Sequence, residues 1–303
     1  MKGIKMQYIE GLKEYTDTKR SAVTFGKFDG LHRGHQKLVE QVNGFKEQKN
    51  VRSVLCTFDM GRRQILMTAQ ERRRYLSGKV DYLVNCPFSD AFRHLSAEDF
   101  IDKVIKRVFH ADYVVIGTDF QFGYGKAGDA KFLKRYEDQY GYRTVVVEKE
   151  RCHGRVISST YIKEVVQKGD MDLAAVLLGY HYEVTGIVEH GRALGRSLGF
   201  PTFNVEWPRE KVAPQKGVYV SRSLVDGVWY GGISNVGVKP TVSEEGRVLI
   251  ESFLFGYDGD AYGKTVRTEL LKFCRPEQRF RSVEEMKKCI DRDIAYGRSY
   301  FEG

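Results

Sequence analysis

The chain has 303 residues, a net charge of +9, and 42% apolar and 29% charged residues, an ordinary globular balance. This length favours two domains rather than one. No apolar run approaches the roughly 20 residues that a membrane-spanning helix needs, and the first residues lack the apolar core of a secretory signal. The composition therefore argues against a membrane protein, and we expect no membrane partner.

The cysteine pattern and the net charge further limit the class of protein and its partners. The five cysteines are scattered without a C-x-x-C pair, which argues against a disulfide framework or a zinc ribbon and indicates a cytoplasmic protein. The basic excess favours anionic partners such as nucleic acid, a membrane surface or phosphorylated small molecules. Because the basic residues are spread out and no nucleic-acid module accompanies them, we expect phosphate-bearing substrates and no nucleic acid. The sequence gives no oligomeric state.

The first 180 residues alternate short β-rich runs with helical patterns. Strands are predicted over 21–25, 51–58, 80–84, 113–117 and 143–150. Helices are predicted over 34–48, 68–76, 100–109, near 130–140, and over 158–169 and 170–179. This alternation predicts parallel strands with helices on both faces, a Rossmann-like α/β domain whose ligands bind beyond the carboxyl ends of the strands.

The pattern changes near residue 182. Six β-rich runs separated by Gly, Pro and Asp follow, over 183–191, 200–207, 217–224, 229–237, 247–255 and 265–273. Their spacing predicts a six-stranded antiparallel β-barrel. A capping box at 282–285 then predicts a C-terminal helix. We expect an N-terminal domain over 1–182 and a C-terminal domain over 183–303.

The most informative stretch of the first half is GKFDGLHRGH, residues 26–35, between a strand and a helix. His32 and His35 lie three residues apart on the first helical turn, where the helix N-terminus favours phosphate. Their N–H groups suit the stabilisation of a departing pyrophosphate, so we predict both as catalytic residues. We predict that a nucleotide binds along this turn, at Gly26, Phe28, Asp29, Gly30 and Gly34, with Gly34 leaving room for its approach. Two histidines are also metal ligands in other proteins, but the scattered cysteines nominate no third ligand.

This stretch resembles the HxGH nucleotidyltransferase superfamily, and its longer GxFDGxHxGH form resembles the FAD synthetase branch. GTDFQFG (117–123) and ISST (157–160) are similar to two further motifs of that branch. The resemblance implies that Asp119, Ser158, Ser159, Thr160 and Lys163 frame the nucleotide. Hydroxyls and free amides at a helix start suit triphosphate oxygens, although Ser158 taken alone is better explained as a helix cap.

Several positions depart from that branch. Lys27 stands where Asn is usual, and TFDMGR (57–62) stands where the family has T-F-x-P-x-P. Lys126 and Lys163 replace Arg, which keeps the positive charge but removes the forked donor geometry.

In the second half, HGRALGRSLGFPTFN (190–204) is a glycine-studded loop that runs into a strand. Thr202 and Asn204 project to one face, and their oxygens suit a Mg²⁺ ion that bridges ATP phosphates. Arg196 and the glycine backbone suit the triphosphate. Any fragment of this stretch is also consistent with an ordinary hairpin. Glu251 lies in an apolar strand, where a carboxylate either has a partner or a chemical role, or faces solvent.

This half resembles riboflavin kinase over nearly its whole length. The similar segments are GRSLGFPTFN (195–204), KGVY (216–219), NVGVKPT (235–241), YG (262–263) and RPE (275–277) with Phe280. The resemblance implies that Thr202 and Asn204 bind Mg-ATP and that Glu251 is the base for the ribityl hydroxyl. Phe203 stands for the usual Ala and Phe253 for the usual His.

Together the two resemblances identify the bifunctional riboflavin kinase/FMN adenylyltransferase family. They imply phosphorylation of riboflavin to FMN with ATP, then adenylylation of FMN to FAD with a second ATP and release of pyrophosphate, with Mg²⁺ as cofactor. Two alternatives stay open: a riboflavin kinase whose first half is a degenerate nucleotide-binding domain, and a flavin-responsive regulator that binds RNA.

Overall fold

The computed structural model describes residues 6–59, 61, 64–189, 200–239 and 246–302. The chain forms two compact units, which are described separately: residues 1–62 with 67–158, and residues 63–66 with 159–303. The helices over 159–167 and 171–178 thus group with the second unit. The functional division into 1–182 and 183–303 stays a prediction.

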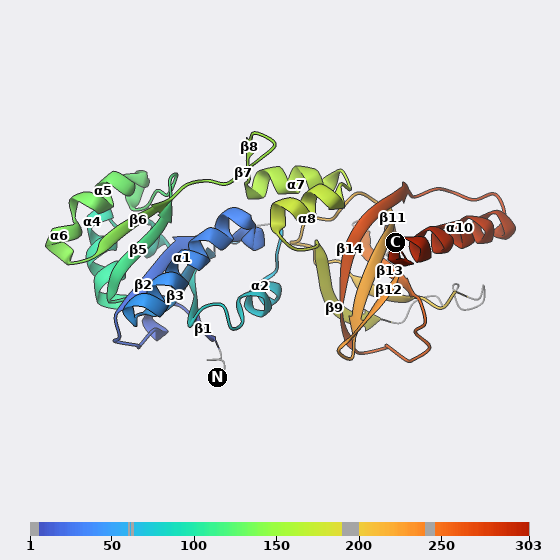
Figure 1. Cartoon of the computed structure of the whole chain (residues 1–303), viewed down its shortest axis with the longest axis horizontal. Coiled ribbons are helices and arrows are strands. Elements are labelled where there is room, and N and C mark those ends of the chain that lie inside the picture. The colour runs from blue at the N-terminus through green and yellow to red at the C-terminus, as the bar shows by residue number, and fades with distance from the viewer. Residues whose placement is uncertain (1–5, 60, 62–63, 190–199, 240–245, 303) are drawn as a thin grey trace. The chain divides into compact units, whose positions relative to one another are not determined.

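The first unit contains a parallel sheet, as predicted (Figure 1). Its strands are β1 (Gln7–Glu10), β2 (Ser21–Gly26), β3 (Arg52–Asp59), β4 (Tyr82–Pro87), β5 (Ala111–Gly117) and β6 (Arg143–Val147), in the order β1-β4-β3-β2-β5-β6. Each neighbouring pair is parallel. The short edge strand β1 was not predicted. A two-stranded hairpin, β7 (Arg151–Cys152) with β8 (Arg155–Val156), follows the sheet.

Helices cover the sheet. They are α1 (Arg33–Lys49), α2 (Ala69–Leu76), α3 (Asp90–Arg93), α4 (Ala97–Asp99) continuing into η3 (Phe100–Val108), α5 (Ala130–Arg135) and α6 (Glu137–Tyr140), with single turns η1 (Leu12–Glu14), η2 (Asp29–Leu31) and η4 (Tyr124–Lys126). Thr68 and Glu71 form a reciprocal capping box that fixes the start of α2. The helix predicted near 130–140 is divided at Tyr136, whose backbone leaves the helical region.

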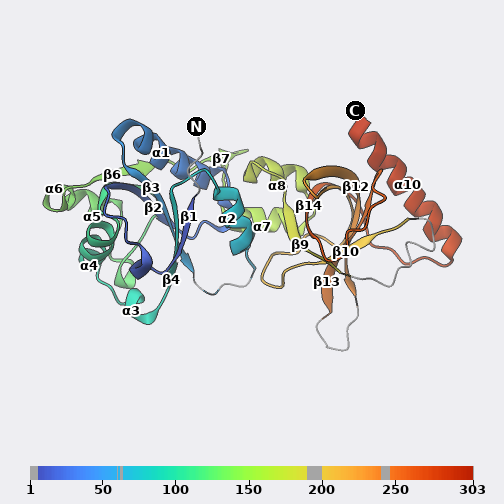
Figure 2. The same cartoon turned by 90° about the horizontal axis from the view of Figure 1, so that it is seen from below.

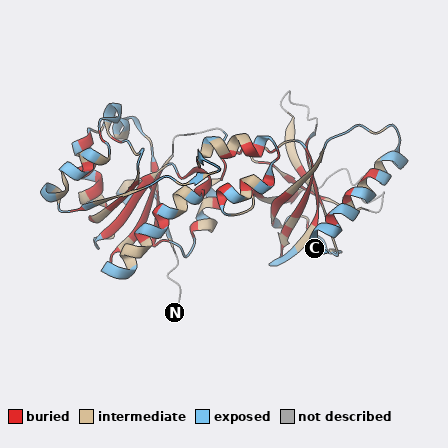
Figure 3. Cartoon of the chain, turned by 45° about the horizontal axis from the view of Figure 1, so that its top comes forward, coloured by how far each residue is buried: buried red, intermediate tan, exposed pale blue. Residues whose placement is uncertain are grey.

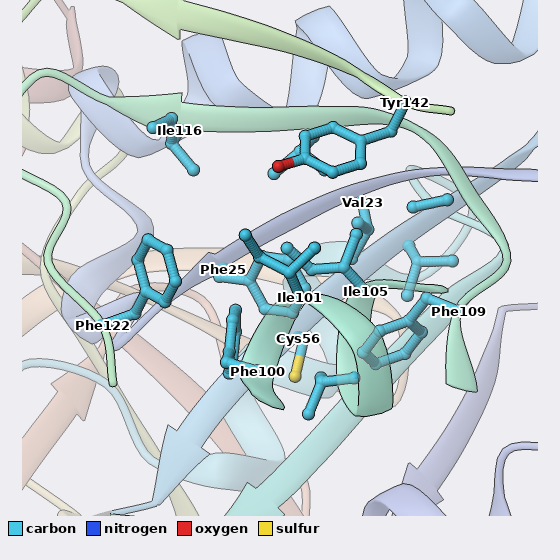
Figure 4. Packing of buried hydrophobic residues seen from close by; sticks show 14 of the residues in the cluster. Val23, Phe25, Cys56, Phe100, Ile101, Ile105, Phe109, Ile116, Phe122 and Tyr142 are labelled. Atoms are coloured by element: carbon cyan, nitrogen blue, oxygen red, sulfur yellow. The ribbon is translucent and has the colours of Figure 1, made fainter. Parts of the chain in front are cut away.

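Alternate residues of each central strand pack on opposite faces of the sheet. Val23, Phe25 and Cys56 face a buried aromatic cluster that includes Phe100 and Phe109 of the η3 region (Figure 4). On the other face, α1 buries Leu38, Val39 and Val42 and contacts β2, β3 and β5. Because β2 is buried along almost its whole length, it holds the turn at its carboxyl end in a fixed position.

The second unit is built on the predicted six-stranded barrel. The barrel closes in the order β10-β13-β12-β11-β14-β9, and every neighbouring pair is antiparallel. Its strands are β9 (Glu183–Glu189), β10 (Phe203–Glu206), β11 (Gly217–Val225), β12 (Val228–Lys239), β13 (Arg247–Leu254) and β14 (Thr265–Pro276). The unit also includes α7 (Ser159–Gln167), α8 (Met171–Leu178) and α10 (Val283–Glu302), the predicted C-terminal helix.

Hydroxyl groups lie inside the barrel and define its inner face. Ser221, Ser234 and Ser252 are fully buried and form a hydrogen-bonded chain with oxygen–oxygen distances of 2.7 and 2.6 Å. Since side chains alternate along a strand, the residue that precedes Ser252, Glu251, projects to the outer face.

The helix α10 lies against the outside of the barrel, as Figures 1 and 2 show. Glycines permit the close approach: a Cβ on Gly231 would lie 2.7 Å from the Phe301 ring, and one on Gly297 would lie 2.5 Å from Ile233. Asp293 of α10 accepts hydrogen bonds from Arg275 of β14, at 2.7 Å from Nη2. The remaining surface of α10 is largely exposed (Figure 3).

A segment that leaves the first sheet is attached to the second unit. The Ile65 backbone N–H donates to Glu210 at 2.7 Å, and the Val212 N–H donates to the Ile65 carbonyl at 2.8 Å. Leu66 is almost completely buried. These contacts explain why residues 63–66 group with the barrel.

Candidate active sites

The strand order of the first unit marks a position for a ligand. From β2 the chain proceeds to one side through β3 and β4, and it later continues on the other side through β5 and β6. The carboxyl ends of β2 and β5 therefore flank the point at which the strand order reverses, where open α/β sheets bind ligands. Gly26 ends β2 and Gly117 ends β5. The segments that carry the predicted histidines and Asp119 therefore begin at this edge.

The turn after β2 is tightly packed. Phe28 adopts a left-handed backbone with φ of 44° and buries its ring completely. A Cβ on Gly26 would lie 3.2 Å from this ring, and Gly30 has φ of 80°, a conformation that favours glycine. Asp29 is also buried. Of the residues predicted to bind nucleotide, Phe28 thus uses its side chain to shape the turn.

The two predicted catalytic histidines lie together. Their rings are stacked with centroids 3.7 Å apart and an angle of 19° between the planes. Burial lowers the pKa of His32 to about 4, a shift that the nearby Asp29 carboxylate partly opposes. Burial also lowers the pKa of His35 well below its ordinary value, with further lowering by His32 and Arg72. Both imidazoles are therefore neutral at physiological pH, and each keeps one N–H donor.

Gly34 has a role within the turn itself, and its predicted contact with a nucleotide stays a prediction. A Cβ at this position would lie 3.3 Å from Cε1 and Nδ1 of the His32 ring. The missing side chain thus makes space for the stacked histidines themselves. Within the described part of the chain, Nδ1 of His32 and of His35 are buried without a hydrogen-bond partner.

Charged residues surround the histidine pair. Arg72 of α2 donates to Thr57 Oγ1 at 3.2 Å, and Thr57 donates to the Lys27 carbonyl at 3.2 Å. Thr57 thus joins the carboxyl end of β3 to the turn after β2, and Arg72 joins α2 to Thr57. Sequence reasoning did not single out Arg72, because nothing in its local pattern indicates that α2 directs it to this edge.

Near His32, the Glu150 carboxylate pairs with Arg33 and lies 3.3 Å from Lys37 Nζ, both on the first two turns of α1. Glu150 is mostly buried and contributes to the potential at His32. Sequence reasoning did not single it out as a site residue, since it lies more than a hundred residues from the histidines.

Asp119 lies in the turn after β5. Its carboxylate is 70% exposed and lies 2.7 Å from Lys149 Nζ. The turn is closed by a hydrogen bond from the Phe120 N–H to the Gly117 carbonyl at 3.1 Å. Gly123 has φ of 74°, and a Cβ there would lie 2.7 Å from the Ala97 nitrogen. The G-x-D-F-x-F-G segment therefore has a backbone that only glycine permits at its last position.

Half-buried aromatic rings gather beside this edge. Phe58 at the end of β3 lies 5.4 Å from Phe92 and 6.3 Å from Phe88, measured between ring centroids. Phe120, after β5, stacks 6.2 Å from Phe25. Sequence reasoning missed this group because its members come from three different strand ends.

The ISST segment opens α7, as predicted. Ser158 immediately precedes the helix, and Ser159, Thr160 and Lys163 lie in its first turns. Thr160 is exposed, whereas the other three are half-buried. Ser158 ends the first unit, and the helix groups with the second.

The predicted kinase residues of the barrel come together on its outer face. Thr202 Oγ1 donates to Glu251 Oε1 at 2.7 Å. Asn204 of β10 and Asn235 of β12 are the two direct cross-strand neighbours of Glu251 on β13. Directly opposite residues project to the same side of a sheet, so the three side chains form one row.

Glu251 is half-buried and hydrogen-bonded, which separates it from an ordinary solvent-facing strand carboxylate. Asn204 is only 4% exposed. Phe253, on the same face, lies 5.9 Å from Phe200 in an edge-to-face arrangement. Arg196 lies outside the described residues.

An ion cluster lies on the same face. Arg247 donates to Glu189 at 3.0 Å and also bonds Glu206. These carboxylates, Glu206 foremost, raise the pKa of Arg247. Because Glu189 is the cross-strand neighbour of Asn204, the cluster joins β9, β10 and β13 beside the candidate kinase site.

Comparisons with known proteins agree with both halves. A family model described as FAD synthetase matches residues 14–161, and one described as riboflavin kinase matches residues 178–301. A bifunctional riboflavin kinase/FMN adenylyltransferase of Pseudomonas fluorescens is 32% identical over 304 residues and 97% of each chain. A protein of the same description from Escherichia coli K12 is 33% identical over 98% of each chain. The chain belongs to this family.

A solved structure shares the whole architecture. The crystal structure of a protein described as a macrolide-efflux protein from Streptococcus pneumoniae has a TM-score of 0.87 and 29% identity, over 97% of this chain and 98% of its own. That description belongs to the other protein. Among the described residues, no helix of this chain is long and apolar enough to cross a membrane.

Membership of the bifunctional family bears on the alternatives that the sequence left open. Both halves match family models, so neither the monofunctional kinase nor the RNA-binding regulator is favoured. The described residues contain no cluster of three or more His, Cys, Asp or Glu side chains that could hold a metal ion. The oxygens of Thr202 and Asn204 suit the different requirement of Mg²⁺, which keeps phosphate and water ligands.

Proposed function

We propose that the barrel phosphorylates riboflavin to FMN with Glu251 as the base, and that the α/β unit adenylylates FMN to FAD with His32 and His35 at the leaving group. The kinase assignment rests on the hydrogen bond of Thr202 to Glu251 in a row that includes Asn204. The adenylyltransferase assignment rests on the stacked, neutral histidine pair at the edge where the strand order reverses.

In the kinase reaction, Glu251 accepts the proton of the terminal ribityl hydroxyl. The hydroxyl oxygen forms a bond to the γ-phosphorus of ATP while the bond from that phosphorus to the bridging oxygen breaks, and ADP leaves with the electron pair. Thr202 and Asn204 would hold Mg²⁺, which supplies charge neutralisation at the phosphates. Hard oxygen donors beside a carboxylate fit this ion. Arg196 is assigned to the triphosphate by the family resemblance.

In the second reaction, a phosphate oxygen of FMN forms a bond to the α-phosphorus of ATP. The bond from that phosphorus to the bridging oxygen breaks, and pyrophosphate leaves with the electron pair. Neutral imidazoles suit this step because they donate N–H bonds to the leaving oxygens without a change in protonation. Arg72, Lys37 and Arg33 add positive charge around the pair.

At the carboxyl edge of the parallel sheet, Asp119, Gly30 and Gly34 are assigned to ATP. The family resemblance also assigns Ser158, Ser159, Thr160 and Lys163 to the nucleotide. The aromatic group of Phe58, Phe88, Phe92 and Phe120 offers an apolar surface to the isoalloxazine ring of FMN.

A cytoplasmic location is part of the proposal. It is supported by the five cysteines, which are all unpaired. ATP and flavin nucleotides as substrates agree with this location.

The experiment that tests the proposal is a product analysis. The full chain is incubated with riboflavin and Mg-ATP, and FMN and FAD are separated by chromatography over time. The proposal requires FMN to appear first and FAD to follow, and both to depend on Mg²⁺. Formation of FMN without FAD would support the kinase assignment alone. Formation of neither FMN nor FAD would contradict both assignments.

A further inference from the structure

The outer row of the barrel contains a residue to which no role has yet been assigned. Asn235 flanks Glu251 on β12, as Asn204 flanks it on β10. Its Nδ2 lies 3.3 Å from Oε1 of Glu277, which follows the end of β14. Glu251 therefore stands between two amide side chains.

The partner of Asn235 fixes how its amide is turned. A carboxylate accepts hydrogen bonds and donates none, so Glu277 binds the NH₂ group of Asn235 and not its carbonyl oxygen. The carbonyl oxygen Oδ1 is then directed away from Glu277. Asn235 thereby presents an acceptor on the face that carries Glu251.

The surroundings of Glu277 are arranged for this contact. Gly237 lies two residues beyond Asn235, on the same face, and a Cβ there would lie 2.2 Å from Glu277 Oε1. Only the absence of a side chain at Gly237 admits the carboxylate. Two residues before Glu277, Arg275 is held by Asp293 of α10 through hydrogen bonds of 2.7 and 3.1 Å. The C-terminal helix thus anchors the segment that carries Glu277.

The order of the row indicates the ligand. Asn204 and Thr202 are assigned to the ATP side of Glu251, and Asn235 lies on its other side. In the transfer, the attacking hydroxyl lies between the γ-phosphate and the rest of the accepting substrate. The side chain beyond Glu251 therefore meets the carbon chain that bears that hydroxyl. In riboflavin this chain is a polyol, a series of hydroxyl donors.

We propose that Asn235 Oδ1 accepts a hydrogen bond from a ribityl hydroxyl other than the one that reacts, and that Glu277 is a positioning residue that sets the orientation of the Asn235 amide. The inference rests on the proposed kinase function. It assigns to the row a binding residue for the accepting substrate, beside the base and the residues for Mg-ATP.

The first test is steady-state kinetics of riboflavin phosphorylation by Asn235→Ala. Loss of one hydrogen bond to the substrate predicts a KM for riboflavin that rises about three- to tenfold. The kcat and the KM for Mg-ATP should change less than about twofold, because the contact is the same in the ground and transition states. An unchanged KM for riboflavin would overturn the inference.

A flavin that keeps only the terminal hydroxyl of the side chain, 7,8-dimethyl-10-(5-hydroxypentyl)isoalloxazine, sharpens this test. It lacks the secondary hydroxyls that Asn235 is proposed to bind. Wild type and Asn235→Ala should therefore phosphorylate this flavin with the same KM. A variant that is equally impaired with both flavins has lost something other than a polyol contact, and the proposal would be wrong.

Glu277 variants test the positioning role. In Glu277→Gln the amide oxygen still accepts from Asn235, so the KM for riboflavin should stay within about twofold of wild type. In Glu277→Lys the new side chain only donates, so Asn235 should turn its oxygen toward it and present NH₂ to the substrate. This variant should reproduce the KM increase of Asn235→Ala. Equal behaviour of the Gln and Lys variants would contradict the orientation argument.

A matched control is available in the first unit. Asn85 donates to Glu10 at 2.6 Å, a pair of the same type outside the barrel, and Asn85→Ala should leave riboflavin kinetics unchanged. Near-ultraviolet circular dichroism of each variant confirms that the barrel is folded. If wild type phosphorylates no riboflavin, or if Glu251→Gln retains full activity, the proposed function fails. If both behave as expected and Asn235→Ala is neutral, only the present inference fails.

Discussion

The two candidate sites differ in the charge and burial of their central side chains. At the edge of the parallel sheet, two imidazoles are buried against each other and kept neutral, with pKa values far below the ordinary value. On the outer face of the barrel, a half-buried carboxylate is held by a neighbouring hydroxyl and flanked by amides. The comparison teaches that donors to a leaving group are preorganised by burial, whereas a base needs access to the proton that it accepts.

The largest effect is expected from Glu251→Gln, which removes the proposed base and keeps the size of the side chain. General-base catalysis contributes about 10²–10⁴ in rate, so kcat for riboflavin phosphorylation should fall by that factor. Thr202 can still donate to the amide oxygen, so the fold should be retained. Single-turnover formation of FMN measures the loss. Near-normal kinase activity would remove Glu251 from the mechanism.

The next effect concerns the histidines. His32→Ala and His35→Ala each remove one proposed donor to the leaving pyrophosphate, and loss of one such preorganised donor typically lowers the rate by about 10²–10³. Pyrophosphate release from FMN and ATP measures this loss, with riboflavin phosphorylation as the internal control. If both variants release pyrophosphate at the wild-type rate, the assignment of the pair is wrong.

The neutral histidines also predict how stability depends on pH. The unfolded chain protonates His32 below about pH 6.5, whereas the folded chain does so only near pH 4. Stability should therefore fall as the pH decreases between these values, by about 2 kcal/mol for His32 at pH 5. Denaturant unfolding of wild type and His32→Asn at pH 7.5 and 5 measures this contribution. Equal pH dependence of the two proteins would show that His32 is not held neutral.

Substitution of two glycines on α1 distinguishes the effect of helix propensity from the effect of site geometry. Gly44 has no described neighbour within 4 Å of an added Cβ, so Gly44→Ala should stabilise the protein by about 0.5–1 kcal/mol. Gly34→Ala should lose this gain, because its Cβ would lie 3.3 Å from the His32 ring, and adenylyl transfer should fall with it. Urea denaturation and pyrophosphate release compare the two variants. Identical effects on both measurements would show that Gly34 makes no space for the histidines.

The smallest effect is expected at Lys163. Lys163→Arg restores the forked donor that the family usually carries there, so adenylyl transfer should stay the same or rise. The effect of this substitution on adenylyl transfer is measured as the KM for ATP in FAD formation. A marked decrease would indicate that the lysine has a specific partner at this position.

The sequence predicted the architecture well because both halves show strong local periodicity. The alternation around β2 and α1 and the six β-rich runs correspond to the sheet and the barrel. The edge strand β1 was missed, since four residues with two half-buried positions show no clear pattern. The helix near 130–140 was predicted as one because Tyr136 fits a helical pattern although its backbone does not.

The candidate sites were predictable only where their residues are close in sequence. His32 and His35 are three residues apart, so spacing alone indicated their proximity, although His32 is the extended N-cap residue of α1 and only His35 lies in its first turn. Arg72 and Glu150 reach the same pair from other elements, and the contact of Asn235 with Glu277 joins residues 42 positions apart. Such relations depend on strand register and helix packing, which a local pattern does not contain.

The central claim is that two chemically distinct sites act in one chain, and a crossed activity measurement tests it most directly. Glu251→Gln is supplied with FMN and Mg-ATP, and His32→Ala is supplied with riboflavin and Mg-ATP, with chromatography of the flavins over time. The account predicts FAD from the first reaction, and FMN without FAD from the second. Loss of both activities in either folded variant, or full conversion of riboflavin to FAD by His32→Ala, would contradict it.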